Sequence, residues 1–199
     1  MSPGARRALV VGASGFLGSR LLALAPRDID LIGTGGRRPV RPGSWRDTQL
    51  DIRSPTALRG LLERERPQAV FFCAYDREDR LATVDAAGRA AAAAAQLGAK
   101  FIFFSTDLVF DGRTGKYDEG APVSPLLPYG AMKADAEVLV RSEHRTAVII
   151  RTSLLVGESG VMMRPAFECE TLLRGQPVTL YGDEWRTPTH VDDVAKGAW

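Results

Sequence analysis

Short apolar runs alternate with segments of helical periodicity along most of the chain. The apolar runs predict strands at 8–12, 28–33, 49–52, 69–74, 100–105 and 147–151. The segments between them carry helical signals, such as the Ser54-Pro55 start that precedes Leu58 and Leu61. Because consecutive parallel strands need a crossover between them, this alternation predicts an α/β fold with a doubly wound parallel sheet.

The alternation stops after residue 156. A helical segment at 161–174 and a short apolar run at 178–180 follow it. A chain of 199 residues is long enough for one substantial domain and part of a second. We therefore predict a first domain at 1–156 and a smaller lobe at 157–199.

A glycine-rich turn follows the first predicted strand directly and opens a helix. Its glycines, Gly12, Gly15 and Gly18, have the spacing G-x-x-G-x-x-G and lack the Gly-Lys-Ser/Thr of a nucleoside-triphosphate loop. Glycines let the backbone approach a pyrophosphate closely, and the N-terminus of a helix presents free N–H groups to it. This context predicts a Rossmann-type dinucleotide site.

The end of the second predicted strand indicates which dinucleotide binds. NAD sites commonly place a carboxylate there for the ribose hydroxyls, but this chain has no acidic residue between Asp30 and Asp47 and instead has Arg37 and Arg38. Guanidinium groups suit a 2′-phosphate. We predict NADP, with NAD as the alternative cofactor. The competing interpretation is that both arginines are ordinary solvated charges.

A candidate catalytic set follows the fifth predicted strand, which ends in Ser105-Thr106-Asp107. Tyr129 and Lys133 come later and are one helical turn apart, so they share a helix face. A cation at that distance is expected to lower the pKa of the phenol and make it a usable acid or base. With the Thr106 hydroxyl, the pair could polarise and protonate a carbonyl group. The alternative is an ordinary surface pair.

Composition excludes several classes of function. A net charge of +2 and a pI near 8.7, without basic runs interleaved with aromatic residues, give no sign of nucleic-acid binding. No apolar run approaches the ~20 residues of a membrane-spanning helix. Glycines and Arg20 interrupt the apolar stretch near the N-terminus, so we expect neither membrane insertion nor export.

The chemistry of the remaining candidate ligands is limited. Cys73 and Cys169 are far apart and lack metal-ligand spacing, and two unpaired thiols favour a cytoplasmic protein. His190 stands close to Asp192 and Asp193, which we interpret as capping residues of a final helix. No metal site is predicted.

These motifs together resemble the extended short-chain dehydrogenase/reductase family, and within it the dTDP-4-dehydrorhamnose reductase group. The chain is also similar to regulatory β subunits of methionine adenosyltransferase. The resemblance covers nearly the whole chain and is most specific in STDLVFDG followed by YGAMK. The matching segments are GASGFLG at 12–18, STDLVFDG at 105–112, YGAMK at 129–133, IIRTSLLVG at 149–157 and RTPTHVDDVA at 186–195.

The resemblance implies a role for individual residues. Tyr129 would be the proton donor, Thr106 would bind the substrate carbonyl, and Lys133 would poise Tyr129 and hold the nicotinamide ribose. Cofactor-binding residues would be Gly12, Ser14, Gly15, Phe16, Leu17, Gly18, Arg37, Arg38, Asp51, Ile52, Cys73, Ala74, Tyr75, Ser105, Tyr129, Lys133, Thr152 and Ser153. Substrate-binding residues would be Thr106, Asp107, Val109 and Arg186.

The implied function is an NADP-dependent reductase of a 4-keto-6-deoxysugar nucleotide. Two alternatives stay open. One is a non-catalytic NADP-binding subunit that regulates a partner enzyme, and the other is a nucleotide-sugar epimerase or dehydratase of the same fold. The assembly could accordingly be a homodimer or a complex with a partner enzyme subunit.

The chain departs from the family pattern at three places. Thr83 stands where the family often has an active-site asparagine, which weakens a water relay from the lysine. Leu108 replaces a common tyrosine and alters the wall of the substrate site. Relatives also continue well past the segment that ends here at Trp199, so we expect an incomplete C-terminal substrate lobe, either in a fragment or in a protein with a reduced substrate side.

Overall fold

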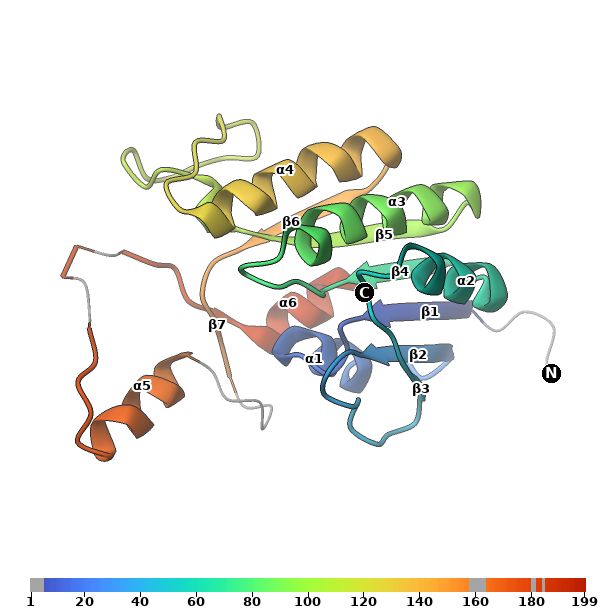
Figure 1. Ribbon diagram of the computed structural model, residues 1–199, viewed down its shortest axis with the longest axis horizontal. Coiled ribbons are helices and arrows are strands. Elements are labelled where there is room, and N and C mark those ends of the chain that lie inside the picture. The colour runs from blue at the N-terminus through green and yellow to red at the C-terminus, as the bar shows by residue number, and fades with distance from the viewer. Residues whose placement is uncertain (1–5, 158–163, 180–181, 184) are drawn as a thin grey trace.

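The computed structural model describes residues 6–157, 164–179, 182–183 and 185–199. Within these residues, six parallel strands form one sheet in the order β3-β2-β1-β4-β5-β6 (Figure 1). The doubly wound α/β prediction is confirmed. The strands are β1 (Arg6–Val11), β2 (Ile29–Gly35), β3 (Arg46–Gln49), β4 (Ala69–Phe72), β5 (Lys100–Thr106) and β6 (Val148–Thr152).

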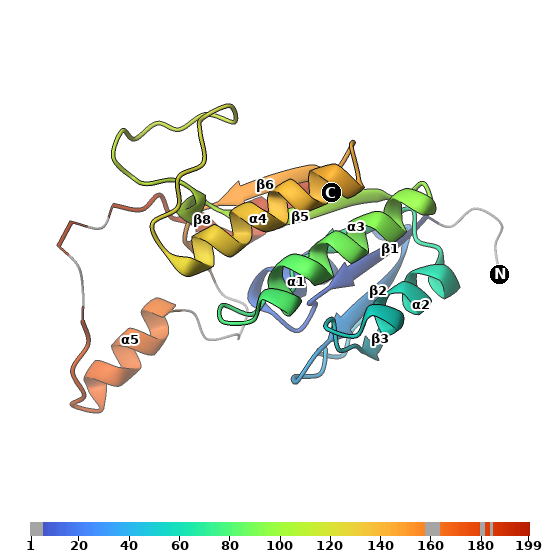
Figure 2. The ribbon, with the colours of Figure 1, turned by 45° about the horizontal axis from the view of Figure 1, so that its top comes forward.

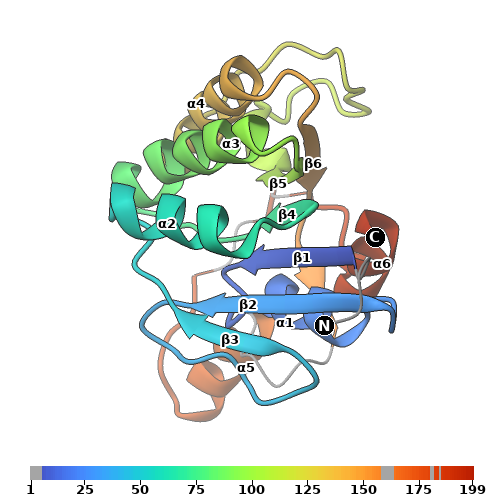
Figure 3. The ribbon, with the colours of Figure 1, turned by 90° about the vertical axis from the view of Figure 1, so that its right-hand side faces the viewer.

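Helices cover both faces of this sheet (Figure 3). One face carries α2 (Pro55–Glu65), α3 (Ala86–Gln96) and α4 (Pro128–Glu143), and the other carries α1 (Phe16–Ala23) and α6 (Val191–Ala198). A π-helical turn, Leu81–Asp85, leads into α3, and a 3₁₀ turn, Asp107–Val109, follows β5. Successive side chains of each strand point to opposite faces of the sheet, as the pleat of a strand requires.

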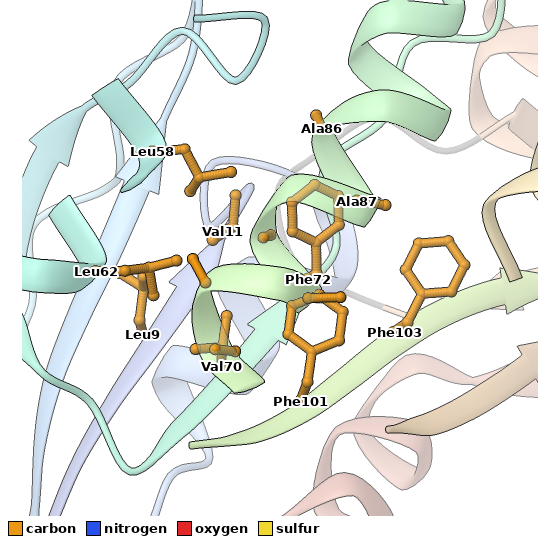
Figure 4. Close-up of a cluster of buried hydrophobic side chains, with 14 of the residues drawn as sticks. Leu9, Val11, Leu58, Leu62, Val70, Phe72, Ala86, Ala87, Phe101 and Phe103 are labelled. Atoms are coloured by element: carbon orange, nitrogen blue, oxygen red, sulfur yellow. The ribbon is translucent and has the colours of Figure 1, made fainter. Parts of the chain in front are cut away.

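The alternation produces two separate hydrophobic cores. Leu9 and Val11 of β1 point to the core under α2, α3 and α4, whereas Val10 points to the core under α1 and α6. Figure 4 shows the first core, where Phe72 lies between neighbouring strand and helix side chains. Its ring centroid is 6.0 Å from that of Phe101. A sheet buried on both faces explains the continuous apolar runs of the sequence.

Several predicted boundaries are wrong. The third strand is Arg46–Gln49 rather than 49–52, because β3 is an edge strand with polar residues that apolar periodicity does not reveal. The fourth strand ends at Phe72, so Cys73 to Asp76 form a loop. Residues 178–179 are not a strand, and residue 180 lies outside the described residues.

The segment after β6 contains shorter elements. Strand β7 (Leu155–Val156) pairs with β8 (Thr189–His190), and α5 (Arg164–Leu173) lies between them in sequence. The predicted helix at 161–174 therefore exists, although residues 161–163 lie outside the described part of the chain. No helix among the described residues is long and apolar enough to cross a membrane.

The last helix, α6, packs against the sheet of the first predicted domain, although it lies within the predicted segment 157–199. Val191 and Ala195 of α6 are fully buried in the core that α1 also covers. The Trp199 ring lies 4.4 Å from that of Phe71 in β4, and its Nε1 donates a hydrogen bond to Leu21 O (3.0 Å). Residues 191–199 thus help to cover one face of the sheet.

Candidate active site

The glycine turn after β1 is built for close backbone approach. Gly12 has φ +88°, and a Cβ there would lie 2.8 Å from Ala74 N. A Cβ at Gly18 would lie 2.3 Å from Gly12 O, so α1 packs against the turn only with glycine at this position. Gly15 is the N-cap of α1 and has no capping side chain, which leaves the first N–H groups of the helix for a ligand.

One cavity of about 2720 Å³ runs along the carboxyl ends of the strands. This is larger than the roughly 300–1,000 Å³ of a typical small-molecule pocket, so it has room for a dinucleotide and a second ligand. Every residue predicted to hold the cofactor, from Gly12 to Ser153, lines it, and so do Thr106, Asp107 and Arg186. The parallel sheet brings these residues together from distant parts of the sequence.

Val109 is the exception among the predicted site residues. Its side chain is fully buried and does not line the cavity, so the structure does not bring it together with the other predicted substrate residues. The 3₁₀ turn after Thr106 rotates Val109 inward, where its carbonyl oxygen accepts a hydrogen bond from Ser124 N (2.9 Å). Leu108 and Phe110, on either side of it, face the cavity instead.

Arginines surround the end of the cavity near β2 and β3. The Arg37 side chain is 83% exposed, and its guanidinium lies 3.4 Å from the Asp76 carboxylate. Asp51 is exposed and accepts hydrogen bonds from Arg53 (2.9 and 3.2 Å), which lower the pKa of its carboxyl group. Arg37 and Arg38 both line the cavity wall there, where a phosphate group would meet positive charge.

The tip of β5 places polar groups in the middle of the cavity. Thr106 Oγ1 donates to Asp107 Oδ1 (3.2 Å) and accepts from Leu108 N (3.2 Å). Asp107 is held in turn by Arg186, whose Nε and Nη2 donate to its two carboxylate oxygens at 3.0 and 2.8 Å. Ser105 Oγ is buried there and has no hydrogen-bond partner among the described residues, which suits a group that meets a ligand.

The first turn of α4 is fitted closely against this strand tip. A Cβ at Gly130 would lie 2.2 Å from Leu108 O, so only glycine permits the contact. Tyr129 directly precedes this glycine. Lys133 lies one helical turn after Tyr129, and the residue is only 3% exposed. The Lys133 ammonium donates to Phe104 O (2.6 Å) and lies 4.0 Å from the Phe103 ring centroid.

The pKa values correct one prediction about this pair. Burial lowers the pKa of Lys133 to about 7. Burial also raises the pKa of Tyr129 above its ordinary value, although a lowered pKa was expected from the neighbouring lysine. The physical reason is that Lys133 is directed at the β5 backbone, whereas the cation that acts on Tyr129 is Arg77, whose Cζ lies 5.0 Å from the ring centroid.

Thr83 has a structural role that the sequence did not indicate. It is fully buried in the π-helical turn, where its Oγ1 donates to Asp76 O (2.5 Å) and accepts from Asp76 N (3.0 Å). It does not line the cavity. Thr83 thus fixes the loop after β4, which carries Tyr75 and Arg77. π-helical turns of this kind often occur at functional sites.

Sequence reasoning missed Arg77 and Arg151, which both line the cavity. Arg77 lies in the loop after β4, and Arg151 is the second-to-last residue of β6. Their position at the carboxyl ends of parallel strands is the signal that could have identified them. Among the described residues, no group of three His, Cys, Asp or Glu side chains is placed to hold a metal ion.

The cavity fits a nicotinamide dinucleotide on structural grounds. The glycine turn leaves no space for a Cβ at Gly12 or Gly18, and the N-cap of α1 has no capping side chain. The Ser105 hydroxyl has no partner among the described residues. The Thr106 hydroxyl and the Tyr129 phenol provide proton donors at the same cavity. Such an arrangement can bind a carbonyl group beside a dinucleotide and protonate its oxygen.

Comparison with known proteins identifies the family of the chain. The family model described as RmlD substrate binding domain matches residues 6–199. The chain is 31% identical over 206 residues to methionine adenosyltransferase 2 subunit beta of Pongo abelii, covering 96% of this chain and 60% of that one. It is 32% identical over 209 residues to a Streptomyces antibioticus protein described as a probable dTDP-4,6-dihydroxy-2-methyloxan-3-one 4-ketoreductase, covering 95% and 64%.

A solved structure shows the same fold over most of the chain. The dTDP-4-dehydrorhamnose reductase of Bacillus anthracis, in complex with NADP, gives a TM-score of 0.79 at 25% identity and covers 97% of this chain and 69% of that one. The chain therefore spans about 60% of the length of the first curated relatives that it matches and about 69% of this enzyme.

Proposed function

The chain belongs to the family described as RmlD substrate binding domain, and from this premise we propose that it is an NADP-dependent reductase of a 4-keto-6-deoxysugar nucleotide. The observation that carries the proposal is that Thr106, Tyr129 and Lys133 line the same cavity as the glycine turn. The similarity to a probable 4-ketoreductase and to a dTDP-4-dehydrorhamnose reductase supports this choice of substrate.

The residues of this chain would act on the keto group as follows. Tyr129 donates its phenolic proton to the carbonyl oxygen, and its raised pKa keeps it protonated at neutral pH until then. The Thr106 hydroxyl turns from Asp107 to donate a hydrogen bond to the same oxygen. Bound NADPH supplies the hydride for the carbonyl carbon. Asp107 and Arg186, which are paired, line the substrate side.

Replacing Tyr129 tests the reaction. We expect Tyr129→Phe to lower kcat for NADPH oxidation with a 4-keto-6-deoxysugar nucleotide by at least about 100-fold, because general acid catalysis typically contributes this much. The dissociation constant for NADPH, measured by fluorescence titration, should change less than about threefold. Unchanged turnover would remove the catalytic assignment of Tyr129 and with it the reductase.

The preference for NADP rests on the arginine loop. Arg37 and Arg38 line the cavity after β2, and the sequence offers no carboxylate there for the ribose hydroxyls of NAD. The double variant Arg37→Ser, Arg38→Ser is expected to weaken NADPH binding about 100-fold and NADH binding less than threefold. Arg41→Ser is the matched control, because Arg41 is in the same loop and outside the cavity wall. Equal losses for both cofactors would contradict the preference.

A second function is favoured by one observation, the 31% identity to methionine adenosyltransferase 2 subunit beta. In that case the chain would bind NADP and regulate a partner enzyme subunit without turning over a keto sugar. Two results together would support it. One is stoichiometric co-purification with an enzyme subunit, and the other is the absence of NADPH oxidation across a panel of keto-sugar nucleotides.

Cytoplasmic location stays a prediction from the two free thiols.

A further inference from the structure

The ring of Tyr129 is enclosed by the loop that follows β4. The centroid of Tyr75 lies 5.4 Å from that of Tyr129, with the rings inclined at 42°. The Arg77 guanidinium lies over the Tyr129 ring, with Cζ 5.0 Å from the centroid. The phenol therefore has a tyrosine and a permanently charged cation as neighbours on the side of this loop.

Hydrogen bonds to the backbone hold this loop in place. The fully buried Thr83 bonds both Asp76 N (3.0 Å) and Asp76 O (2.5 Å), and Asp76 Oδ1 accepts from Glu78 N (3.1 Å). Arg77 lies between these two anchored residues. Its Cα is thus fixed relative to the π-helical turn, although its side chain is exposed. Fixing the backbone limits the positions that the guanidinium can reach.

Among the groups around Tyr129, Arg77 is the cation that lowers the pKa of the phenol. Burial raises the pKa of Tyr129 most, and Tyr75 and then Asp107 raise it further, although Arg186 pairs with the Asp107 carboxylate. Lys133, on the same helix as Tyr129, points its ammonium at Phe104 O, and its pKa of about 7 means that it loses its charge near neutral pH. Arg77 keeps its charge throughout this range and lowers the pKa of Tyr129.

We propose that Arg77 is a positioning residue of the active site, whose guanidinium over the Tyr129 ring stabilises the phenolate that proton transfer leaves behind. This role rests on the proposed reductase. In the step, the O–H bond of Tyr129 breaks and a new O–H bond forms on the substrate oxygen. The phenolate oxygen keeps the electron pair. Arg77 exchanges no proton and acts through its charge.

A titration without substrate tests this role. Difluorotyrosine, whose phenol titrates at lower pH than that of tyrosine, is incorporated at position 129, and its ¹⁹F shift is followed against pH. We expect Arg77→Gln to raise the midpoint by about one pH unit, a tenfold change in proton affinity, and Arg77→Lys to raise it less. Arg80→Gln is the control, because Arg80 pairs with Asp135 on the outside of α4 (2.5 Å).

Turnover then separates a failure of this role from a failure of the reductase. With an active enzyme, Arg77→Gln should lower kcat about tenfold and move the alkaline limb of the pH profile upward, with the NADPH dissociation constant within threefold. A shifted fluorine midpoint in a protein that never oxidises NADPH would uphold the effect of Arg77 and overturn the reductase. A midpoint in Arg77→Gln equal to that of Arg80→Gln would overturn the role of Arg77, whatever the turnover.

Discussion

At the scale of single residues, the site depends on burying ionisable groups. Lys133 is 3% exposed, and among the described residues its ammonium donates a hydrogen bond only to Phe104 O, so its charged form is poorly solvated. Its pKa consequently falls from 10.5 to about 7. Lys133, which belongs to the proposed catalytic set, therefore lowers the stability of the fold when its buried ammonium is charged. Such conflicts between function and stability are expected at active sites.

This cost predicts how stability depends on pH. The folded-state pKa of Lys133 lies below that of the unfolded chain, so the unfolded chain binds more protons between about pH 7 and 10. The contribution of Lys133 to stability therefore rises across this window. Lys133→Met is expected to raise the free energy of unfolding by about 3 kcal/mol near pH 7, and the advantage should shrink towards pH 10.

Urea unfolding at several pH values checks this expectation. The control is Lys100→Met, because Lys100 is an exposed lysine at the start of β5. A variant at position 133 that is less stable than the native chain at pH 7, or an advantage that stays constant to pH 10, would contradict the argument.

The sequence predicted which residues meet at the site but not their electrostatics. The spacing of Tyr129 and Lys133 fixes them on one helix face, and the strand ends bring Thr106 to the same cavity, so both features follow from local periodicity. Burial and side-chain direction depend on tertiary packing. For this reason the pKa of Tyr129 was predicted with the wrong sign, and Arg77 was not recognised as the cation at its ring.

At the scale of elements, α4 and β6 are joined by a nearly buried ion pair. Arg151 of β6 donates to both carboxylate oxygens of Glu137 in α4, at distances from 2.6 to 3.2 Å. The Arg151 guanidinium also lies 5.0 Å from the Phe110 ring centroid, and Phe110 stacks on Tyr117 at 4.3 Å. The pair thus connects α4 to the loop between β5 and α4, which projects beyond the start of that helix (Figure 2).

Breaking this pair on one side should cost more than removing it. Arg151→Met leaves the Glu137 carboxylate, 5% exposed in its side chain, without its partner. We expect this variant to lose about 3 kcal/mol of unfolding free energy. The double variant Arg151→Met, Glu137→Met should recover most of the loss, because no uncompensated charge remains.

Denaturant unfolding of the two single variants and the double variant measures this coupling. Arg59→Met is a control, because Arg59 forms an exposed pair with Glu63 within α2. Its effect should be below about 1 kcal/mol. Additive losses at positions 137 and 151 would show that the pair contributes nothing specific to the α4–β6 contact.

The same scale explains which elements the sequence could not locate. β3 consists of Arg46, Asp47, Thr48 and Gln49 on an edge of the sheet, so it has no apolar run, and the predicted strand was displaced to 49–52. Local pattern finds strands that are buried on both faces, such as β5, because burial on both faces dictates their composition. The edge strand β3 is identified by its backbone pairing with β2, which only the structure shows.

At the scale of the whole molecule, the first and last helices, α1 and α6, are joined on one face of the sheet. Arg20 of α1 donates to both oxygens of Asp192 in α6, at 2.5 and 2.8 Å. Asp192 was predicted to cap α6, but His190 is the N-cap, and its Nδ1 accepts from Asp192 N (3.2 Å). Local pattern could not reveal a contact between residues 172 positions apart, so the sequence did not indicate that α6 packs beside α1.

Substituting Asp192 tests how firmly α6 belongs to the first domain. Asp192→Asn removes the ion pair with Arg20, and Asp193→Asn, at an exposed neighbour in the same first turn, removes only the interaction of a carboxylate with the helix dipole. We expect a loss of about 2 kcal/mol of unfolding free energy for Asp192→Asn and about 0.5 kcal/mol for Asp193→Asn at pH 7.

The dependence on pH identifies the cause of the larger loss. Hydrogen bonds from Arg20 lower the pKa of Asp192 below its ordinary 3.8, so its contribution to stability is complete above about pH 5 and disappears as pH falls through the folded-state value. The difference between the native chain and Asp192→Asn should therefore vanish in acid. If it persisted at pH 2, the loss would come from packing, and if both variants lost the same at pH 7, Arg20 would not anchor α6 to α1.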